Sequence, residues 1–307
     1  MNIFITGVGG FIGSHLKEYL QKYYTEYSLF TPSSQELNLY DEKAVDDFIL
    51  SNNIDIIIHL ANKGGGRDTL DMKNLTEYNL RIFFNIAKHE KNVKKIISFG
   101  SGAEYSKHKP IINVEENDAL DSLPLDEYGF YKSITSKYIE KSDNMVQLRI
   151  FGCYGEYENY RYKFISNAIV KNIFKMPIVI NRNVFFDYIY IGDMLKIIDW
   201  FMHNDAKHKV YNATTGEKID LLRIAQLINK ISDFESDIKI LNNGFNNEYT
   251  ASNKRLLEEV EIEFTSHENA INKLRKYFLL NKDILEKDII LNDPYLKHID
   301  NIWKKDR

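Results

Sequence analysis

The sequence has 307 residues, with 40 Lys and Arg against 44 Asp and Glu, a formal net charge of −4 and a pI near 6.1. A chain of this length can bury a sizeable core, and its near balance of charge gives no indication of a nucleic-acid partner. No apolar run reaches the roughly 18 residues of a transmembrane helix, so we expect no membrane partner. The one cysteine, Cys153, and the scattered histidines indicate neither a disulfide framework nor a metal site. Because the chain begins directly with an apolar strand pattern, without a signal peptide, we expect a cytoplasmic protein.

Glycines follow the first expected strand at a regular spacing. Residues 2–5 are apolar β-formers, Gly7, Gly10 and Gly13 come next, and residues 14–20 have helical periodicity. A dinucleotide-binding fold needs this order. The first glycine permits a tight turn, the second lets the backbone approach a pyrophosphate, and the third lets the helix pack on the strand. A glycine motif alone also fits an ordinary turn.

Strand and helix patterns then alternate along the first two hundred residues, which predicts βαβ units and a parallel sheet. The expected strands are 27–31, 54–60, 95–99 and 145–151, and the expected helices are 42–50, 78–89 and 128–140. Beyond residue 155 the expected helices are 163–172, 193–202 and 221–231, the expected strands are 178–180 and 210–213, and 185–191 is a strand or a bend.

This pattern predicts an α/β fold, with a Rossmann-type doubly wound parallel sheet and a smaller C-terminal α/β substrate lobe. We expect the dinucleotide-binding domain in residues 1–160, with later segments such as 185–215 interleaved, and the substrate lobe in 161–280. We assign no role to the charged tail of residues 281–307, which contains Trp303.

A tyrosine, a lysine and a serine form the strongest chemical signal. Tyr128 and Lys132 lie four apart and therefore share one face of the expected helix. A lysine ammonium beside a phenol favours the phenolate and lowers its pKa toward the working pH. Ser101 follows an expected strand, and ligands of open α/β sheets bind at the carboxyl ends of strands. The serine can therefore hydrogen-bond a substrate carbonyl oxygen beside Tyr128. Taken singly, these residues also fit an exposed helix pair and a turn.

With these residues in this order, the sequence resembles the extended short-chain dehydrogenase/reductase family, in its nucleotide-sugar-modifying epimerase/dehydratase group, over roughly residues 1–265. The segments that carry the resemblance are 6–13 (TGVGGFIG), 58–61 (IHLA), Asn79, Ser101, Tyr128 with Lys132, and 149–155 (RIFGCYG). Segment 187–193 is similar to the family's R-D-F-x-Y-V-x-D pattern, with Phe186 in the place of the arginine. Segments 36–41 and 63–66 are most similar to the GDP-L-fucose synthase-like 4-ketoreductases.

The resemblance implies three competing chemistries. Sugar 4,6-dehydratases carry an Asp-Glu pair where this chain has Gly102 and Ala103, so dehydration is disfavoured, and we expect Glu104 at the rim of the site. GDP-fucose synthases also invert C3 and C5 with a cysteine and a histidine, whose places fall at Ala103 and near Lys163. We therefore expect this chain to lack the C3 and C5 epimerase activity of GDP-fucose synthases. Cys153 lies in a different motif and is expected in the core. The third chemistry is 4-epimerisation with a tightly held NAD and the same Ser/Tyr/Lys set.

The residues after the second expected strand indicate which dinucleotide cofactor the protein binds. NAD-dependent relatives place an acidic residue there, but residues 31–35 contain none before Glu36. The serine hydroxyls of Ser33 and Ser34 can donate to a 2′-phosphate, so we expect NADPH, with NADH as the other candidate. The residues expected at the cofactor are Gly7, Gly9, Gly10, Phe11, Ile12, Gly13, Ser33, Ser34, Asn38, Leu39, Leu60, Ala61, Asn79 and Lys132.

The resemblance leads to one main hypothesis, the NADPH-dependent reduction of the C4 keto group of a nucleotide-diphospho-4-keto-6-deoxy sugar, with Ser101, Tyr128 and Lys132 as catalytic residues. GDP is the favoured nucleotide, the sugar is a hexose or a heptose, and the product belongs to surface-polysaccharide biosynthesis. The residues expected at this substrate are Ser101, Gly102, Ala103, Tyr128, Asn167, Arg182, Asp187 and Lys254. The alternatives are an NAD-dependent 4-epimerase and a non-catalytic NAD(P)-binding protein. The family also implies a homodimer.

Overall fold

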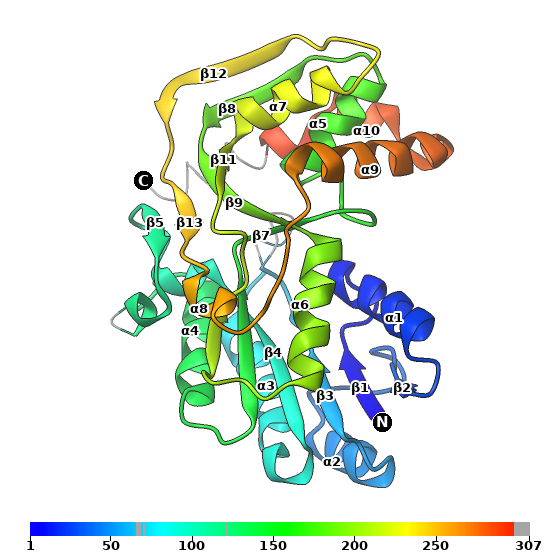
Figure 1. Cartoon of the computed structure of the whole chain (residues 1–307), viewed down its shortest axis with the longest axis vertical. Coiled ribbons are helices and arrows are strands. Elements are labelled where there is room, and N and C mark those ends of the chain that lie inside the picture. Colours follow the sequence, from blue (N-terminus) through cyan, green and yellow to red (C-terminus); the bar gives the residue numbers. More distant parts are fainter. Residues whose placement is uncertain (66–68, 70–71, 121, 298–307) are drawn as a thin grey trace.

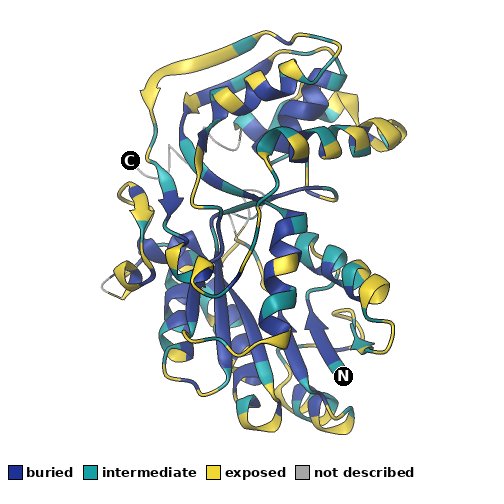
Figure 2. Ribbon diagram, in the orientation of Figure 1, coloured by how far each residue is buried: buried dark blue, intermediate teal, exposed yellow. Residues whose placement is uncertain are grey.

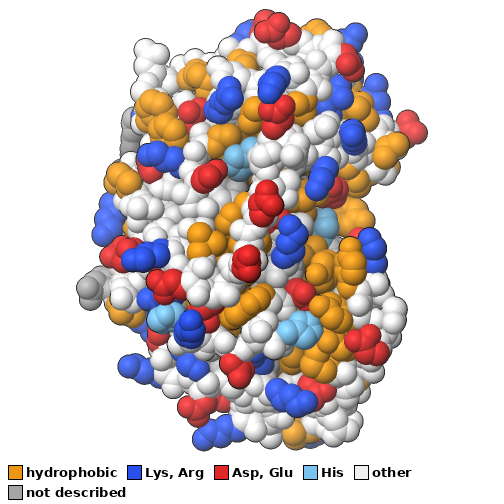
Figure 3. Space-filling model, in the orientation of Figure 1, with side chains coloured by type: hydrophobic (Ala, Val, Ile, Leu, Met, Phe, Trp, Pro, Cys, Tyr) orange, Lys and Arg blue, Asp and Glu red, His pale blue; other side chains and the backbone are white. Residues whose placement is uncertain are grey.

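The structure is a computed structural model that describes residues 1–65, 69, 72–120 and 122–297. Gly66 of the 63–66 segment and Trp303 lie outside the described residues, as does the end of the 281–307 tail. In the described part of the chain, no helix is long and apolar enough to cross a membrane. Figure 3 shows basic and acidic side chains interspersed over one face, without a large patch of a single sign.

Six parallel strands form the main sheet, in the order β10-β6-β4-β3-β1-β2 (Figure 1). Their bounds are β1 (Asn2–Thr6), β2 (Ser28–Phe30), β3 (Ile56–His59), β4 (Lys95–Ser101), β6 (Met145–Ile150) and β10 (Val210–Asn212). Since β2 and β3 pair with opposite sides of β1, the chain reverses its winding there. The carboxyl end of β1 is thus a topological switch point, where open α/β sheets bind ligands.

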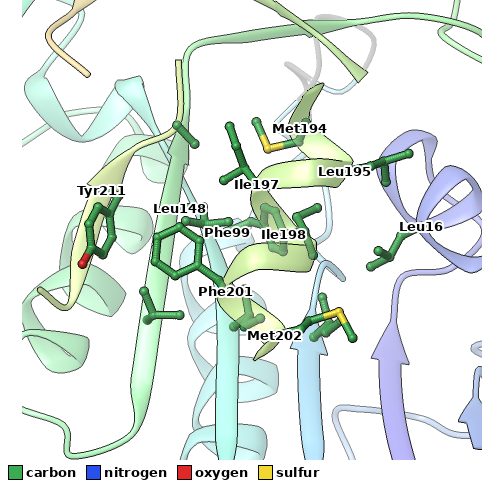
Figure 4. Close-up of a cluster of buried hydrophobic side chains, with 14 of the residues drawn as sticks. Leu16, Phe99, Leu148, Met194, Leu195, Ile197, Ile198, Phe201, Met202 and Tyr211 are labelled. Carbon is green, nitrogen blue, oxygen red and sulfur yellow. The ribbon is translucent and has the colours of Figure 1, made fainter. Parts of the chain in front are cut away.

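Helices cover both faces of this sheet, so the prediction of a doubly wound Rossmann-type fold is confirmed. Leucines of α1 (Phe11–Tyr23) and the apolar face of α6 (Ile191–His203) pack on one face of the strands, as Figure 4 shows for Leu16, Phe99 and Ile198. The opposite face buries side chains of three further helices, α2 (Glu42–Ser51), α3 (Leu75–Ala87) and α4 (Glu127–Ile139). Apart from the edge strand β2, which is only partly buried, the strands are buried on both sides (Figure 2), which explains their continuous apolar runs.

The smaller lobe has its own apolar core, built mainly from elements after residue 150. Its helices are α5 (Phe164–Ile173), α7 (Leu221–Lys230), α9 (His267–Leu280) and α10 (Lys287–Leu291). A second sheet, in the order β11-β9-β13-β5 with β7 beside β9, joins this lobe to the parallel sheet. Its strands are β5 (Ile111–Val114), β7 (Gly152–Tyr154), β9 (Phe185–Tyr190), β11 (Lys218–Asp220) and β13 (Tyr249–Ala251).

A two-stranded sheet pairs β8 (Ile178–Asn183) with β12 (Ile238–Phe245), which is exposed along almost its whole length (Figure 2). The remaining elements are short: α8 (Lys254–Leu257), η2 (Glu90–Asn92), η3 (Gly102–Tyr105), η4 (Glu116–Ala119) and η5 (Lys282–Ile284). Residues 185–191, expected as a strand or a bend, form β9. The interleaved segments α6 and β10 return to the first lobe.

Candidate active site

A cavity of about 1600 Å³ lies between the carboxyl ends of the parallel strands and the smaller lobe. Its walls combine the glycine turn, Ser101, Tyr128 and Lys132 with residues of β9 and β13. The expected cofactor residues that line it are Gly7, Gly9, Gly10, Phe11, Ile12, Gly13, Ser33, Ser34, Asn38, Leu39, Leu60, Ala61 and Lys132.

The glycine turn provides a backbone cradle at one end of this cavity. Gly7 has φ +72°, and a Cβ on it would lie 2.7 Å from the backbone nitrogen of Ala61. A Cβ on Gly13 would lie 2.3 Å from the carbonyl oxygen of Gly7, so α1 can approach β1 this closely only with glycine there. Helix α1 begins at this turn without a side-chain cap. Its first N–H groups are therefore available to an anion, and the residues present fit a dinucleotide pyrophosphate.

The loop after β2 contains an acidic residue in an unexpected position. Glu36 lines the cavity with Ser33 and Ser34, and its carboxylate accepts a hydrogen bond of 2.7 Å from the Ser33 N–H. This hydrogen bond holds the pKa of Glu36 below its usual value. From the sequence, Glu36 stands too late to serve as the acidic residue that follows the second strand. The N–H groups of Glu36 and Leu37 both donate to the Ser33 carbonyl oxygen and close a turn. This turn returns Glu36 to the cavity wall beside Ser33.

Two buried polar side chains beside the cavity support the loop that follows β3. Asn79 does not line the cavity; its amide accepts from the Lys63 N–H at 2.8 Å and donates to the Lys63 carbonyl at 2.9 Å. Thr6 Oγ1 accepts the Ala61 N–H and lies 2.9 Å from Nδ1 of His59. Burial, with the nearby charge of Lys132, lowers the pKa of His59 to about 3, so this imidazole is neutral at physiological pH.

Ser101, Tyr128 and Lys132 line the same cavity. Ser101 ends β4, and Tyr128 lies in the first turn of α4, where the Asp126 side chain caps the helix through the Gly129 N–H at 2.8 Å. The Ser101 hydroxyl acts on the Tyr128 phenol and lowers its pKa, in opposition to the effect of burial. The Lys132 Nζ lies 5.9 Å from the centre of the Tyr128 ring and donates to the carbonyl oxygen of Phe99.

Burial acts on both titratable members of this group. Desolvation raises the pKa of Tyr128 to about 12, against the opposing effect of the Ser101 hydroxyl. Desolvation also lowers the pKa of Lys132 to about 8. Burial thus favours the neutral form of each side chain.

Glu104 is not at the rim of the site, as the sequence suggested, but fully buried beneath it. Its carboxylate accepts from the Ser101 N–H at 2.9 Å, from Gln147 Nε2 at 2.8 Å and from Arg149 Nε at 2.6 Å. Arg149 in turn donates to Ser136 Oγ on α4 at 2.6 Å. This network links the turn that carries Ser101 to the helix that carries Tyr128 and Lys132.

The comparisons with known proteins agree with this geometry. The family model described as "NAD dependent epimerase/dehydratase family" matches residues 3–214. The chain belongs to this family. The prediction of an NAD(P)-dependent enzyme of the epimerase/dehydratase group is therefore confirmed.

Individual members of the epimerase/dehydratase family resemble the chain over nearly its whole length. It is 23% identical to the GDP-L-colitose synthase of Yersinia pseudotuberculosis, over 92% of this chain and 99% of the relative. A GDP-L-fucose synthetase structure from Naegleria fowleri has a TM-score of 0.79 at 17% identity, covering 93% of this chain and 94% of that one. A GDP-mannoheptose C4 reductase from Campylobacter jejuni, with NADP bound, has a TM-score of 0.77 at 19% identity, covering 91% and 98%. At these identities the two structures show a shared fold.

Several residues that the family pattern predicted to contact the substrate do not line the cavity. Gly102 and Ala103 are buried beside Ser101 and do not line the cavity. Asp187 is buried and accepts from Thr215 and from the Gly216 N–H. The others that do not line the cavity are Asn167, buried in α5, and the exposed Arg182 and Lys254. Their contact with substrate stays a prediction that this geometry does not support.

Other residues line the cavity although they were not among the predicted binding residues. Lys107 and Lys109 follow η3, and the Lys107 Nζ lies 5.6 Å from the centre of the Tyr128 ring. Lys163 and Cys153 also line the wall, so the cysteine borders the cavity instead of lying wholly in the core. Tyr249 of β13 also lines the cavity. The basic Lys107-His108-Lys109 run was the one visible signal among them.

Proposed function

We propose that this member of the family reduces the C4 keto group of a nucleotide-diphospho-4-keto-6-deoxy sugar with NADPH. The observation that carries the proposal is the convergence of Ser101, Tyr128 and Lys132 on a cavity large enough for a dinucleotide and a sugar nucleotide. We further propose GDP as the nucleotide, since the relatives include proteins named for GDP-colitose, GDP-fucose and GDP-mannoheptose. Homodimer formation, a cytoplasmic location and the domain bounds 1–160 and 161–280 also remain proposals.

The bound cofactor would supply a hydride to C4, and the chain's own residues would manage the proton and the developing negative charge. Tyr128 holds its proton at neutral pH, because burial raises its pKa to about 12. It would give this proton to the C4 oxygen as the alkoxide forms. The Lys132 ammonium would stabilise the resulting phenolate, and the Ser101 hydroxyl would donate a hydrogen bond to the same C4 oxygen.

The residues after Ser101 support simple reduction over dehydration. Gly102 and Ala103, which occupy the places of the dehydratases' acid pair, have no group that transfers protons. The carboxylate of Glu104 faces away from the cavity, toward Gln147 and Arg149. In this account, Tyr128 is the only proton donor that the reaction needs.

One observation favours a second candidate, the NAD-dependent 4-epimerase. Glu36 places a carboxylate beside Ser33 and Ser34, where it would repel a 2′-phosphate and could accept from a ribose hydroxyl instead. A 2′-phosphate that binds the Ser33 amide would have to displace this carboxylate.

Tyr128→Phe tests the proposed chemistry, because it removes the proton donor and keeps the ring. We expect keto-sugar reduction to fall by at least about 100-fold, the usual contribution of a general acid. NADPH affinity, measured by fluorescence titration, should stay close to that of the wild type. A variant that keeps most of its activity would refute the assignment of Tyr128.

A further inference from the structure

The glycines of the 63–66 segment have taken no part in the proposed reaction so far. The structure describes residues 63–65 of this segment, which belong to the loop that follows β3. Gly64 and Gly65 have φ values of +72° and +89°, a region that residues with a side chain rarely adopt. Gly65 lines the same cavity as Tyr128. The loop therefore needs its glycines at a point where it borders the candidate active site.

The backbone of Gly65 packs directly against the ring of Tyr128. A Cβ on Gly65 would lie 2.3 Å from Cε2 and 2.5 Å from Cδ2 of this ring. It would also lie 3.1 Å from Cζ, the carbon that carries the hydroxyl. Since a Cβ is only one bond away from its Cα, the Cα of Gly65 is itself in contact with the ring. The loop thus limits where the phenol can lie.

Side-chain hydrogen bonds hold this loop in place. The amide of Asn79 on α3, which is 1% exposed, accepts from the Lys63 N–H at 2.8 Å and donates to the Lys63 carbonyl at 2.9 Å. The side-chain amide of Asn62 donates to the Gly64 carbonyl at 2.7 Å. Because the backbone on the N-terminal side of Gly65 is fixed in this way, we expect a side chain at position 65 to displace the tyrosine ring and not the loop.

The ring of Tyr128 also has contacts within its own helix. Tyr131 packs against it edge-on, at 5.4 Å between ring centres, and the Lys132 Nζ lies 5.9 Å from its centre. The loop after β3 adds a contact from a different element of the fold. The exact place of the ring matters, because a proton donor must lie within hydrogen-bonding reach of its acceptor, and a misplacement of about 1 Å can cost about 100-fold in rate.

We propose that Gly65 is a positioning residue: its backbone, held by the Asn79-anchored loop, fixes the Tyr128 phenol at the place where it meets the reacting oxygen. The proposal rests on the function proposed above, in which Tyr128 gives its proton to the C4 oxygen. It assigns Asn79, which does not line the cavity, an indirect part in the same step through the Lys63 backbone.

The test compares Gly65→Ala with Gly244→Ala, using whichever 4-keto sugar nucleotide the wild type turns over. Both changes add a Cβ at positive φ, +89° and +79°, but at position 244 the Cβ meets nothing within 4 Å. In Gly65→Ala the ring must move by about 1 Å to restore ordinary carbon contact. We expect its kcat to fall by about 10- to 100-fold, with less than about a threefold change in KM. Gly244→Ala should keep the wild-type kcat, although the strained φ should lower both melting temperatures alike.

A double-mutant cycle separates positioning from general damage to the site. In the Tyr128→Phe background, Gly65→Ala should have almost no further effect on the residual rate, because the displaced proton donor is already absent. If Gly65→Ala does not fold, Asn79→Ala takes its place: it releases Lys63 and should lower kcat by about three- to tenfold. Wild-type kcat in the variant that folds, or an equal loss with and without the Tyr128 hydroxyl, would overturn the proposal.

If the wild type itself reduces no keto sugar, the proposed function fails, and a structural measurement still decides this inference. Crystal structures of the wild type and Gly65→Ala in the same crystal form would show the Tyr128 ring directly. We expect the ring to be displaced by about 1 Å in the variant. A ring at its wild-type place, with the new Cβ accommodated by a shift of the loop, would refute the positioning role.

Discussion

The Tyr128 phenol and the Lys132 ammonium lie in the same cavity, and burial favours the uncharged form of both. The pKa of the phenol is raised to about 12, so Tyr128, the proposed proton donor, keeps its proton over the whole physiological range. The pKa of the ammonium is lowered to about 8, so Lys132 loses its proton at a lower pH than Tyr128 does. The pH dependence of the enzyme should therefore reflect the lysine.

We expect kcat/KM for keto reduction to fall as the pH rises through about 8, because Lys132 then loses the charge that we propose stabilises the phenolate. Below this pH the lysine is charged and Tyr128 is protonated, so the rate should be level until the substrate or other groups titrate. Initial rates over a pH series with the wild type measure the effect. A profile that stays flat to well above pH 9 would contradict it.

Glu36 should influence the choice of cofactor. Its carboxylate accepts the Ser33 N–H beside the expected 2′-phosphate position, and Glu36→Gln removes the charge while it keeps an acceptor. We expect the ratio of kcat/KM for NADPH over NADH to rise by about two- to fivefold, the range of an exposed charge interaction. Glu26→Gln, an exposed change outside the cavity, is the control. An unchanged ratio would show that Glu36 does not face the ribose.

Glu104 and Arg149 form a buried ion pair, so the loss of one partner leaves a buried charge uncompensated. We expect Glu104→Ala to lower the free energy of unfolding by about 3–5 kcal/mol, measured by urea denaturation. Replacing both partners by apolar residues, as in Glu104→Leu with Arg149→Met, should cost less than the single change. A single variant of wild-type stability would contradict the structural role of the pair.

The β1–turn–α1 unit depends on the absence of a side chain at Gly13. Gly13→Ala would place a Cβ 2.3 Å from the Gly7 carbonyl and 2.7 Å from the Cα of Val8, so the helix must move away from the strand. We expect a lower melting temperature without cofactor and weaker NADPH binding. Gly9→Ala meets nothing within 4 Å, so it should leave the melting temperature of the cofactor-free protein unchanged. Equal melting temperatures of the two variants would argue against this packing.

The elements that the sequence predicted best are those with a pattern of their own. Strand β3 is a run of three isoleucines buried on both faces, and the glycine turn has a fixed spacing. The three-residue strands β7, β11 and β13 have no such pattern, because their pairing partners are distant in the sequence and decide their conformation.

The residues of the candidate site likewise divide into those with a local sequence signal and those placed only by distant pairing. Ser101, Tyr128 and Lys132 could be selected because their local context, a strand end and a helix face, brings them to the cavity. Tyr249 could not, because only the pairing of β13 with β9 carries it there. Asp187 has the family's spacing, yet its carboxylate serves the backbone of the 215–216 turn.

The cavity is shared by both lobes, so a ligand bound there should stabilise the whole molecule. At about 100 times its Kd, a ligand that binds only the folded state adds about 2.7 kcal/mol. We expect NADPH to raise the melting temperature by several degrees in differential scanning fluorimetry. The Gly13→Ala variant should respond less, because its cradle is displaced. A wild-type melting temperature that responds to neither NADPH nor NADH would contradict the binding site described above.

We propose above that the enzyme is a net reductase of a 4-keto sugar nucleotide. The most direct measurement follows NADPH absorbance with freshly generated GDP-4-keto-6-deoxymannose, with NADH and a dTDP-linked keto sugar as parallel substrates. We predict that one NADPH is oxidised for each sugar reduced at C4, and NMR of the product would then show C3 and C5 with their original configurations. No oxidation of added cofactor, together with NAD(H) released when the purified protein is denatured, would contradict the reductase and favour the 4-epimerase.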